Sequence, residues 1–259
     1  MQVIANILSE SGIEPKAALL LAFLLIFVPA LPYLRRRIID GASPTLRPIP
    51  GFKALQQMSG QSMETGRPLH LSVGIQGVGN QNAAQTLAGL TTLEYLARET
   101  AVYGAPPIVT VADPTAFIVG QDVLRRAFEG RSKTGRFARD AVRMIAPDPV
   151  AYASGVMGIL SREDVLANIM IGAFSAEYLL IGETGVRMGI HQVVGTGNPQ
   201  ALPFMLATAD EVLIGEEMFA GGAYLAKLPT HIASLLIQDW MRLLIVLIII
   251  AGIIWNTVF

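Results

Sequence analysis

The sequence predicts an α/β fold: a mainly parallel, Rossmann-like sheet built of repeated βα units and bracketed by N- and C-terminal transmembrane helices. Three observations predict it. An apolar run at residues 69–75 precedes a glycine-rich turn and a long helical pattern from Asn82, which is how a βα unit opens. Strand-then-helix patterns recur at intervals of roughly thirty residues through residues 67–228. A long uncharged apolar run lies toward each end of the chain.

The composition favours one globular domain with membrane segments. Of 259 residues, 52% are hydrophobic and only 15% are charged, which is too apolar for an ordinary cytosolic protein. The absence of cysteine excludes disulfides, thiolate metal sites and cysteine nucleophiles. A net charge of -1 gives no global attraction to nucleic acid, so no DNA partner is expected.

The N-terminal part predicts a membrane anchor. After a short leader at residues 1–16, residues 17–34 carry no charge and are followed by three arginines, so we predict a transmembrane helix at residues 17–37. A cleaved signal peptide, the alternative, carries its positive charge before the apolar run. Pro29 and Pro32 predict a kink or the end of this helix. The arginines place the following domain in the cytoplasm and the N-terminus outside.

Residues 229–259 predict a second transmembrane helix. Its last seventeen residues are uncharged, and Trp240 and Trp255 lie near its two ends, where aromatic rings favour membrane interfaces. A buried core helix, the alternative, would carry a polar stripe. The predicted location is therefore the inner (plasma) membrane, with two spans in contact with membrane lipids, the domain facing the cytoplasm, and both termini outside.

Between the anchors, residues 38–66 predict an extended connector with one short helix near residues 52–58, and residues 67–228 a cytoplasmic α/β domain. Predicted strands lie at residues 69–75, 108–112, 142–146, 168–174, 190–195 and 202–207. Residues that can cap a helix are each followed seven positions later by glycine, at Asn82, Asp113, Asp148, Ser175 and Thr208. Two alternatives remain open: continuous helix for residues 150–160 and 165–174, and a solenoid with a period of 33 residues.

The carboxyl edge of such a sheet is where ligands bind. The run Gly77-Val-Gly79 resembles a dinucleotide fingerprint, but the third glycine is missing and Asp113 follows Gly79 by 34 residues, not by about twenty. A phosphate cradle and a turn that needs glycine dihedrals are the two interpretations. The predicted ligand-binding residues are Gly74, Gly77, Gly79, Asn80 and Asp113. The same edge would carry Asp148, Ser175, residues 195–198 and Thr208.

No catalytic residue, metal site or cofactor is predicted. Asp113 and Asp148 could form a carboxylate pair, but each precedes a proline and is already explained as a helix N-cap. Glu183, Glu216 and Glu217 could bind a metal with Asp210, although acidic side chains on solvated helix faces are commoner. His70 lies on a predicted strand and is expected to be a hydrogen-bonded core or edge residue.

The stretch of residues 125–143 holds seven basic and two acidic residues. Anionic lipid, an acidic partner surface and RNA are its possible contacts, and a solvated loop is the alternative. The predicted lipid or partner contacts are Arg125, Arg126, Arg131, Lys133, Arg136 and Arg139.

Three segments carry a resemblance: residues 71–85 (LSVGIQGVGNQNAAQ), 93–97 (LEYLA) and 109–114 (VTVADP). They resemble a family of prokaryotic membrane proteins catalogued only as a domain of unknown function, from about Met58 to Leu225. The resemblance implies membrane attachment and no assigned activity.

Two functions follow. The first is a non-enzymatic membrane-anchored scaffold or assembly protein, because an apolar, sparsely charged domain exposes surface that a homo-oligomer or a larger membrane complex would cover. The alternative is a binding module, enzymatic or not, for a nucleotide or other anionic small molecule at the carboxyl edge of the sheet.

Overall fold

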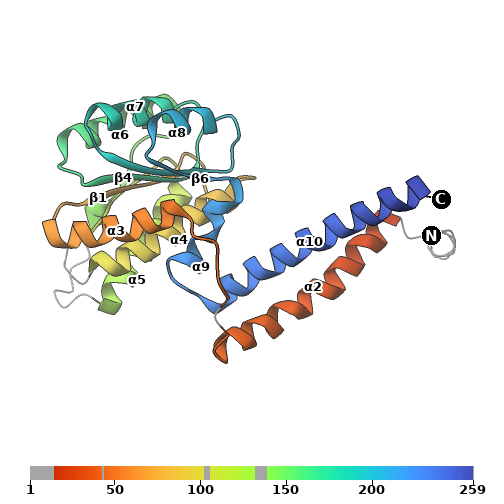
Figure 1. Ribbon diagram of the computed structural model, residues 1–259. Coiled ribbons are helices and arrows are strands. Elements are labelled where there is room, and N and C mark those ends of the chain that lie inside the picture. The colour runs from red at the N-terminus through yellow and green to blue at the C-terminus, as the bar shows by residue number, and fades with distance from the viewer. Residues whose placement is uncertain (1–14, 43, 102–105, 132–138, 259) are drawn as a thin grey trace. The chain divides into compact units, whose positions relative to one another are not determined.

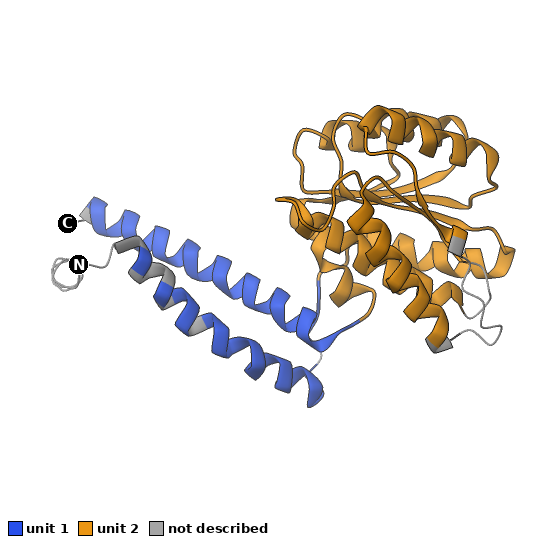
Figure 2. Ribbon diagram, turned by 180° about the vertical axis from the view of Figure 1, so that it is seen from behind, with its two compact units in different colours: residues 1–46, 227–259 blue, residues 47–226 orange. Residues whose placement is uncertain are grey.

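The computed structural model describes residues 15–42, 44–101, 106–131 and 139–258 (Figure 1). The chain divides into two compact units. One combines residues 1–46 with residues 227–259, and the other comprises residues 47–226 (Figure 2).

Residues 47–226 form an α/β unit around one six-stranded parallel sheet. Its strands are β1 (Leu69–Gly74), β2 (Ile108–Val111), β3 (Val142–Met144), β4 (Ala167–Ala173), β5 (His191–Thr196) and β6 (Glu211–Ile214). The order β3-β2-β1-β4-β5-β6 is that of the doubly wound Rossmann arrangement. The chain moves outward from β1 to β3 and then returns to the other side of β1, so the topological switch point lies between β1 and β4. The predicted parallel α/β sheet is confirmed.

Helices cover both faces of this sheet (Figure 1). On one face lie α3 (Pro50–Thr65), α4 (Ala83–Thr100), α5 (Pro114–Arg131) and α9 (Gly221–Tyr224), with the 3-10 turn η3 (Gly215–Ala220). On the other lie α6 (Pro149–Arg162), α7 (Tyr178–Arg187) and α8 (Leu202–Thr208). A second 3-10 turn, η2 (Arg139–Ala141), precedes β3. Because helices cover both faces, every residue of β1, β2 and β4 is buried, and most of these residues are apolar.

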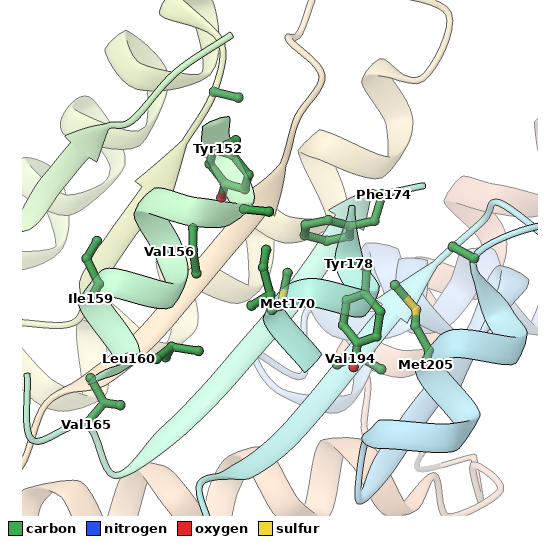
Figure 3. Packing of buried hydrophobic residues seen from close by; sticks show 14 of the residues in the cluster. Tyr152, Val156, Ile159, Leu160, Val165, Met170, Phe174, Tyr178, Val194 and Met205 are labelled. Atoms are coloured by element: carbon green, nitrogen blue, oxygen red, sulfur yellow. The ribbon is translucent and has the colours of Figure 1, made fainter. Parts of the chain in front are cut away.

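The core beneath α6, α7 and α8 is large and aromatic. Figure 3 shows Tyr152 of α6 and Tyr178 of α7 pointing toward the sheet, among Met170 and Val194 from its strands. Phe174, which follows β4, meets Tyr178 edge-on with ring centroids 6.3 Å apart. This packing holds the end of β4 firmly under the start of α7.

Two predicted elements at the end of the domain are wrong. Residues 202–207 form helix α8, with proline in its first turn, and the helix predicted from Thr208 is replaced by strand β6. The segment starting at Thr208 matches the one starting at Ser175 closely in sequence, yet only the latter is helical. Position in the fold decides the difference: Val193 pairs with Glu211, and Leu213 is buried in the strand.

The structure also decides the helix and solenoid alternatives and shows what the predicted connector contains. Residues 150–160 lie in helix α6, but β4 occupies residues 167–173, so the helix alternative is wrong for the second of its two segments. The single sheet with a switch point replaces the solenoid alternative. Within the predicted connector, α3 runs for 16 residues and ends at Gly66, whose φ of 71° closes the helix.

The other unit consists of α2 (Pro15–Ile39) and α10 (Pro229–Val258), which pack antiparallel (Figures 1 and 2). Leu34 is buried against Ala233 and Ile237, and further apolar side chains of both helices surround this contact. Of the two outcomes predicted at Pro29 and Pro32, the end of the helix does not occur, because α2 continues to Ile39. Ala30 and Leu31, which lie between the two prolines, pack against the cluster that α2 shares with α10.

Within the part of the chain that the structure describes, one helix, Pro229–Thr257, is long and apolar enough to cross a membrane. Its length and composition support membrane association weakly. The predicted N-terminal span at residues 17–37 does not appear as a second candidate.

Candidate functional site

A pocket of about 320 Å³ opens at the topological switch point. Its walls come from three segments that follow β1, β4 and β5, and from the first turn of α4. The lining residues are Ile75, Gln76, Asn82, Gln85, Ala173, Phe174, Ser175, Gly197, Asn198 and Pro199. This is the crevice outside the carboxyl ends of the strands, where open parallel sheets bind ligands. Its volume is at the small end of the usual range for ligand sites, about 300–1,000 Å³.

Amide side chains tie the walls of the pocket together. The Gln85 side-chain oxygen accepts hydrogen bonds from the Gly197 backbone N–H at 2.8 Å and from the Thr196 hydroxyl at 3.2 Å. Asn198 Nδ2 donates to the Phe174 carbonyl oxygen at 2.9 Å and to the Ser175 hydroxyl at 3.3 Å. These bonds connect α4, the β4–α7 loop and the β5–α8 loop, so the walls of the pocket hold one another in place.

The pocket lining is uncharged among the described residues. One carboxylate, that of Glu177, lies next to the lining residue Ser175, and that of Asp113 follows β2 on the other side of β1. Glu177 accepts from the Ser175 backbone N–H at 2.7 Å next to α7, and Asp113 caps α5. At the start of α4, by contrast, Asn82 makes no capping bond through its side chain. The positive end of the α4 dipole at this edge therefore has no side-chain cap, and no acidic residue lies in the first turn of the helix.

Two of the predicted ligand-binding residues, Gly77 and Asp113, lie together but outside the pocket lining. A Cβ placed on Gly77 would be 2.3 Å from Asp113 Oδ1 and 2.6 Å from Thr115 Oγ1. The Val78 backbone N–H donates to Thr115 Oγ1 at 3.0 Å. The glycine turn thus packs on the β2–α5 junction, which is the geometry expected of a structural turn.

Asp113 is engaged within its own helix start. Its Oδ1 accepts from the Thr115 backbone N–H at 2.8 Å and from the Ala116 N–H at 3.4 Å. The hydrogen bond from the Thr115 hydroxyl, helped by these two, lowers the pKa of Asp113 below its usual range. An ionised carboxylate against Gly77 disfavours a phosphate group on the same turn.

The remaining predicted residues have distinct surroundings. Gly74 ends β1 with a φ of 95°, and a Cβ there would be 2.6 Å from the Ala173 backbone nitrogen. It immediately precedes Ile75 of the lining. Gly79 has open space around it, and Asn80 Nδ2 donates to the Gln76 side-chain oxygen at 2.6 Å. Ligand binding by these residues stays a prediction.

Sequence reasoning located part of this pocket. Ser175, Gly197 and Asn198 were expected at the carboxyl edge and line it. Gln85 was missed because a glutamine in the first turn of a helix has no motif of its own. Its role depends on β5 lying two strands away from β1, which only the strand order reveals.

A close approach of α4 to the sheet supports the pocket floor. A Cβ on Gly89 would lie 2.1 Å from the Ile171 carbonyl oxygen and 3.2 Å from Val73 Cα. In the dinucleotide fingerprint, the third glycine permits this same helix–strand approach. Gly89 therefore permits the close approach for which the fingerprint's third glycine, missing here, is used.

A buried polar network crosses the sheet below the pocket. His70 Nδ1 lies 2.7 Å from Asn168 Oδ1, and its Nε2 lies 3.0 Å from Thr110 Oγ1. Thr110 also contacts the hydroxyl of Tyr152 at 2.8 Å. Complete burial lowers the pKa of His70 to about 4, so the ring is neutral at pH 7. His70 is a hydrogen-bonded core residue, as expected.

The acidic candidates are used in other ways. Asp148 caps α6 by accepting from the Ala151 backbone N–H at 2.8 Å. Glu183 pairs with Arg187 at 2.9 Å, and Glu217 pairs with Arg47. Across the described ranges, no group of three or more acidic or histidine side chains could hold a metal ion.

The predicted basic contacts are only partly described. Arg125 and Arg126 lie on α5, where both pair with Asp122. Arg131 ends α5 and Arg139 begins η2. Lys133 and Arg136 fall outside the described residues. Lipid or partner contact through this set stays a prediction.

Comparison with known proteins gives one match. No curated protein and no solved structure matches the chain. One family matches over residues 10–259, which is nearly the whole chain and includes every wall of the pocket. The chain therefore belongs to the family described as a domain of unknown function (DUF6754).

Proposed function

We propose that the protein is a membrane-anchored binding module: α2 and α10 both cross the plasma membrane, and the α/β unit binds a small polar molecule in the switch-point pocket. The observation that carries the proposal is the pocket itself, which opens where doubly wound sheets bind their ligands and is held open by amide hydrogen bonds.

The chemistry of the walls narrows the ligand. Four side-chain amides and a hydroxyl line the pocket, and no charged side chain of the described residues does. The carboxylate of Glu177, next to Ser175, opposes a multiply charged anion, whereas the uncapped start of α4 favours one acceptor group or one negative charge. A polar molecule with a single carbonyl or carboxylate end fits this arrangement better than a polyphosphate.

The anchoring follows from the charge pattern. Residues 17–34 of α2 are uncharged and long enough to span about 27 Å, and exposed arginines follow at residues 35–37. By the positive-inside rule, the α/β unit faces the cytoplasm and the outer ends of both helices face outward. The antiparallel packing of α2 on α10 agrees with a hairpin that crosses twice.

Native mass spectrometry of the full-length protein in detergent tests the ligand. We expect the wild type to carry a stoichiometric mass of a few hundred daltons beyond lipid. Ser175→Trp, which fills the pocket, should lose this mass, and Ser161→Trp on the exposed side of α6 should keep it. A wild type without bound mass, or equal masses in both variants, would contradict the binding module.

A self-associating scaffold is the second candidate. It is favoured by large apolar side chains that lie exposed on the outer helix layer, among them Leu179, Leu180 and Val186 of α7 and Leu206 of α8. Lysine or glutamate at Val186 and Leu206 should then reduce the oligomer mass, and an unchanged mass would contradict a scaffold built on this surface.

A further inference from the structure

Helix α10 is mostly apolar, and its one acidic residue, Asp239, and its one arginine, Arg242, form a pair. Arg242 Nη1 donates to Asp239 Oδ1 at 3.2 Å, one turn away. Their side chains are 52% and 66% exposed, so the pair lies on the outer surface of the α2–α10 hairpin. From Leu243 to Val258 the helix carries no further charge.

The packing of the two helices fixes the level of this pair. Ala233 and Ile237 of α10 lie against Leu34, and the same cluster extends to Met241 on α10 and to Phe27 on α2. Because the helices are antiparallel, higher numbers on α10 face lower numbers on α2. Asp239 and Arg242 therefore lie at the level of residues 27–31 of α2.

One membrane surface must serve both helices. If the membrane surface lies at the level of Arg35, Phe27 is eight residues, or about 12 Å at helical rise, deeper in the membrane. If the membrane surface lies at the level of Arg242 instead, only residues 17–27 of the uncharged part of α2 remain within the membrane. They span about 16 Å, whereas a hydrocarbon core needs about 30 Å. The first placement spans the bilayer with both helices, and it puts Asp239 and Arg242 inside.

Charged side chains inside a bilayer face protein or water and find partners, because exposure to lipid is costly. An acid and a base one turn apart form a self-complementary surface: under two-fold symmetry, each Asp239 meets the Arg242 of the other chain. We propose, on the basis of the double membrane crossing proposed above, that Asp239 and Arg242 lie within the hydrocarbon layer and pair there with Arg242 and Asp239 of a second copy of this chain.

The first test measures association of the full-length chain reconstituted in liposomes. Because the chain has no cysteine, Gln238→Cys on exposed α10 supplies a single crosslinking site. In this background, Asp239→Arg and Arg242→Asp should each lower the crosslinked fraction at least tenfold, because like charges then face each other. Mixing the two variants should restore it, since two arginines then face two aspartates. Glu183→Arg, which breaks a similarly exposed pair on α7, is the matched control and should change nothing.

The second test measures depth with spin labels at Gln238→Cys, Ile250→Cys and the reference Asp40→Cys. The labels at 238 and 250 should collide more often with oxygen, which dissolves in the bilayer, than with a water-soluble nickel chelate. The label at 40 should collide more often with the nickel chelate. Nickel access at both 238 and 250 would overturn the membrane crossing itself. Nickel access at 238 alone would overturn the buried charge pair and leave the crossing standing. Oxygen access at both, with crosslinking insensitive to the charge swaps, would overturn pairing between copies.

Discussion

Gln85 accepts a hydrogen bond from the backbone N–H of Gly197 at 2.8 Å, and this bond joins the helix that follows β1 to the loop that follows β5. The two residues are 112 positions apart in the sequence. They meet because β4 and β5 are added on the side of β1 opposite to β2.

Gln85→Leu should loosen this junction. The substitution keeps the size of the side chain but removes the acceptor used by Gly197 and Thr196, so we expect a loss of about 1 kcal/mol in unfolding free energy. Denaturant unfolding of the full chain in detergent measures it. Gln81→Leu, on the exposed turn before α4, is the control, and equal losses in the two variants would argue against the junction.

Gly77→Ala and Gly79→Ala should differ. An alanine methyl at residue 77 would overlap Asp113 Oδ1, so the turn must move, at an expected cost of about 1–3 kcal/mol. Gly79 has nothing within 4 Å, and its alanine variant should change the unfolding free energy by less than about 0.5 kcal/mol. Thermal unfolding compares them. Similar midpoints would mean that the turn does not rest on the β2–α5 junction.

Gly89→Ala and Gly158→Ala should have opposite signs. A methyl at residue 89 meets the Ile171 carbonyl oxygen and pushes α4 off the sheet, which we expect to cost about 1–3 kcal/mol. Gly158 lies in α6 with open space around it, so alanine there should add up to about 1 kcal/mol through helix propensity. If both variants were less stable than the wild type, the expected gain from helix propensity at residue 158 would be contradicted.

Acid should destabilise the fold through His70. Because its pKa is lowered from 6.5 to about 4 in the native state, the unfolded state binds more protons between these values. Stability is therefore independent of this group above pH 6.5 and falls as the pH drops toward 4, by up to about 3 kcal/mol.

Unfolding of the wild type and of His70→Gln between pH 7 and pH 5 measures this slope, which the variant should lack. His191→Gln, at an exposed position, is the control and should keep it. A wild-type slope equal to that of His70→Gln would show that His70 is not the group responsible.

Local sequence predicted the elements whose starts are marked by an N-cap residue and a proline, or by a long apolar run. Asp113 and Asp148 precede prolines and begin helices, as expected, and the apolar run at residue 69 became the central strand. The similarity of the segments that start at Ser175 and Thr208 gave a wrong prediction for the second one. Cap residues, glycines and apolar residues suit a helix or an edge strand equally well. Pairing with β5 decided for a strand at residues 211–214.

At the candidate site too, local sequence predicted some features and tertiary contacts decided the others. The glycine turn was visible in the sequence, but its packing against Asp113 is a tertiary contact that no spacing rule contains. The pocket lies on the other side of β1, where β4 and β5 end, and strand order is the one quantity that single-sequence patterns leave open.

The hairpin unit takes its two helices from the two ends of the chain, with residues 47–226 between them. At ordinary rates of synthesis, about 5–20 residues per second, these roughly 180 residues take on the order of ten to forty seconds to make. For that interval α2 has left the ribosome while the surface that α10 will cover, around Leu34, is still bare. The α/β unit can complete its sheet during this delay, so the hairpin is the last part of the chain that can close.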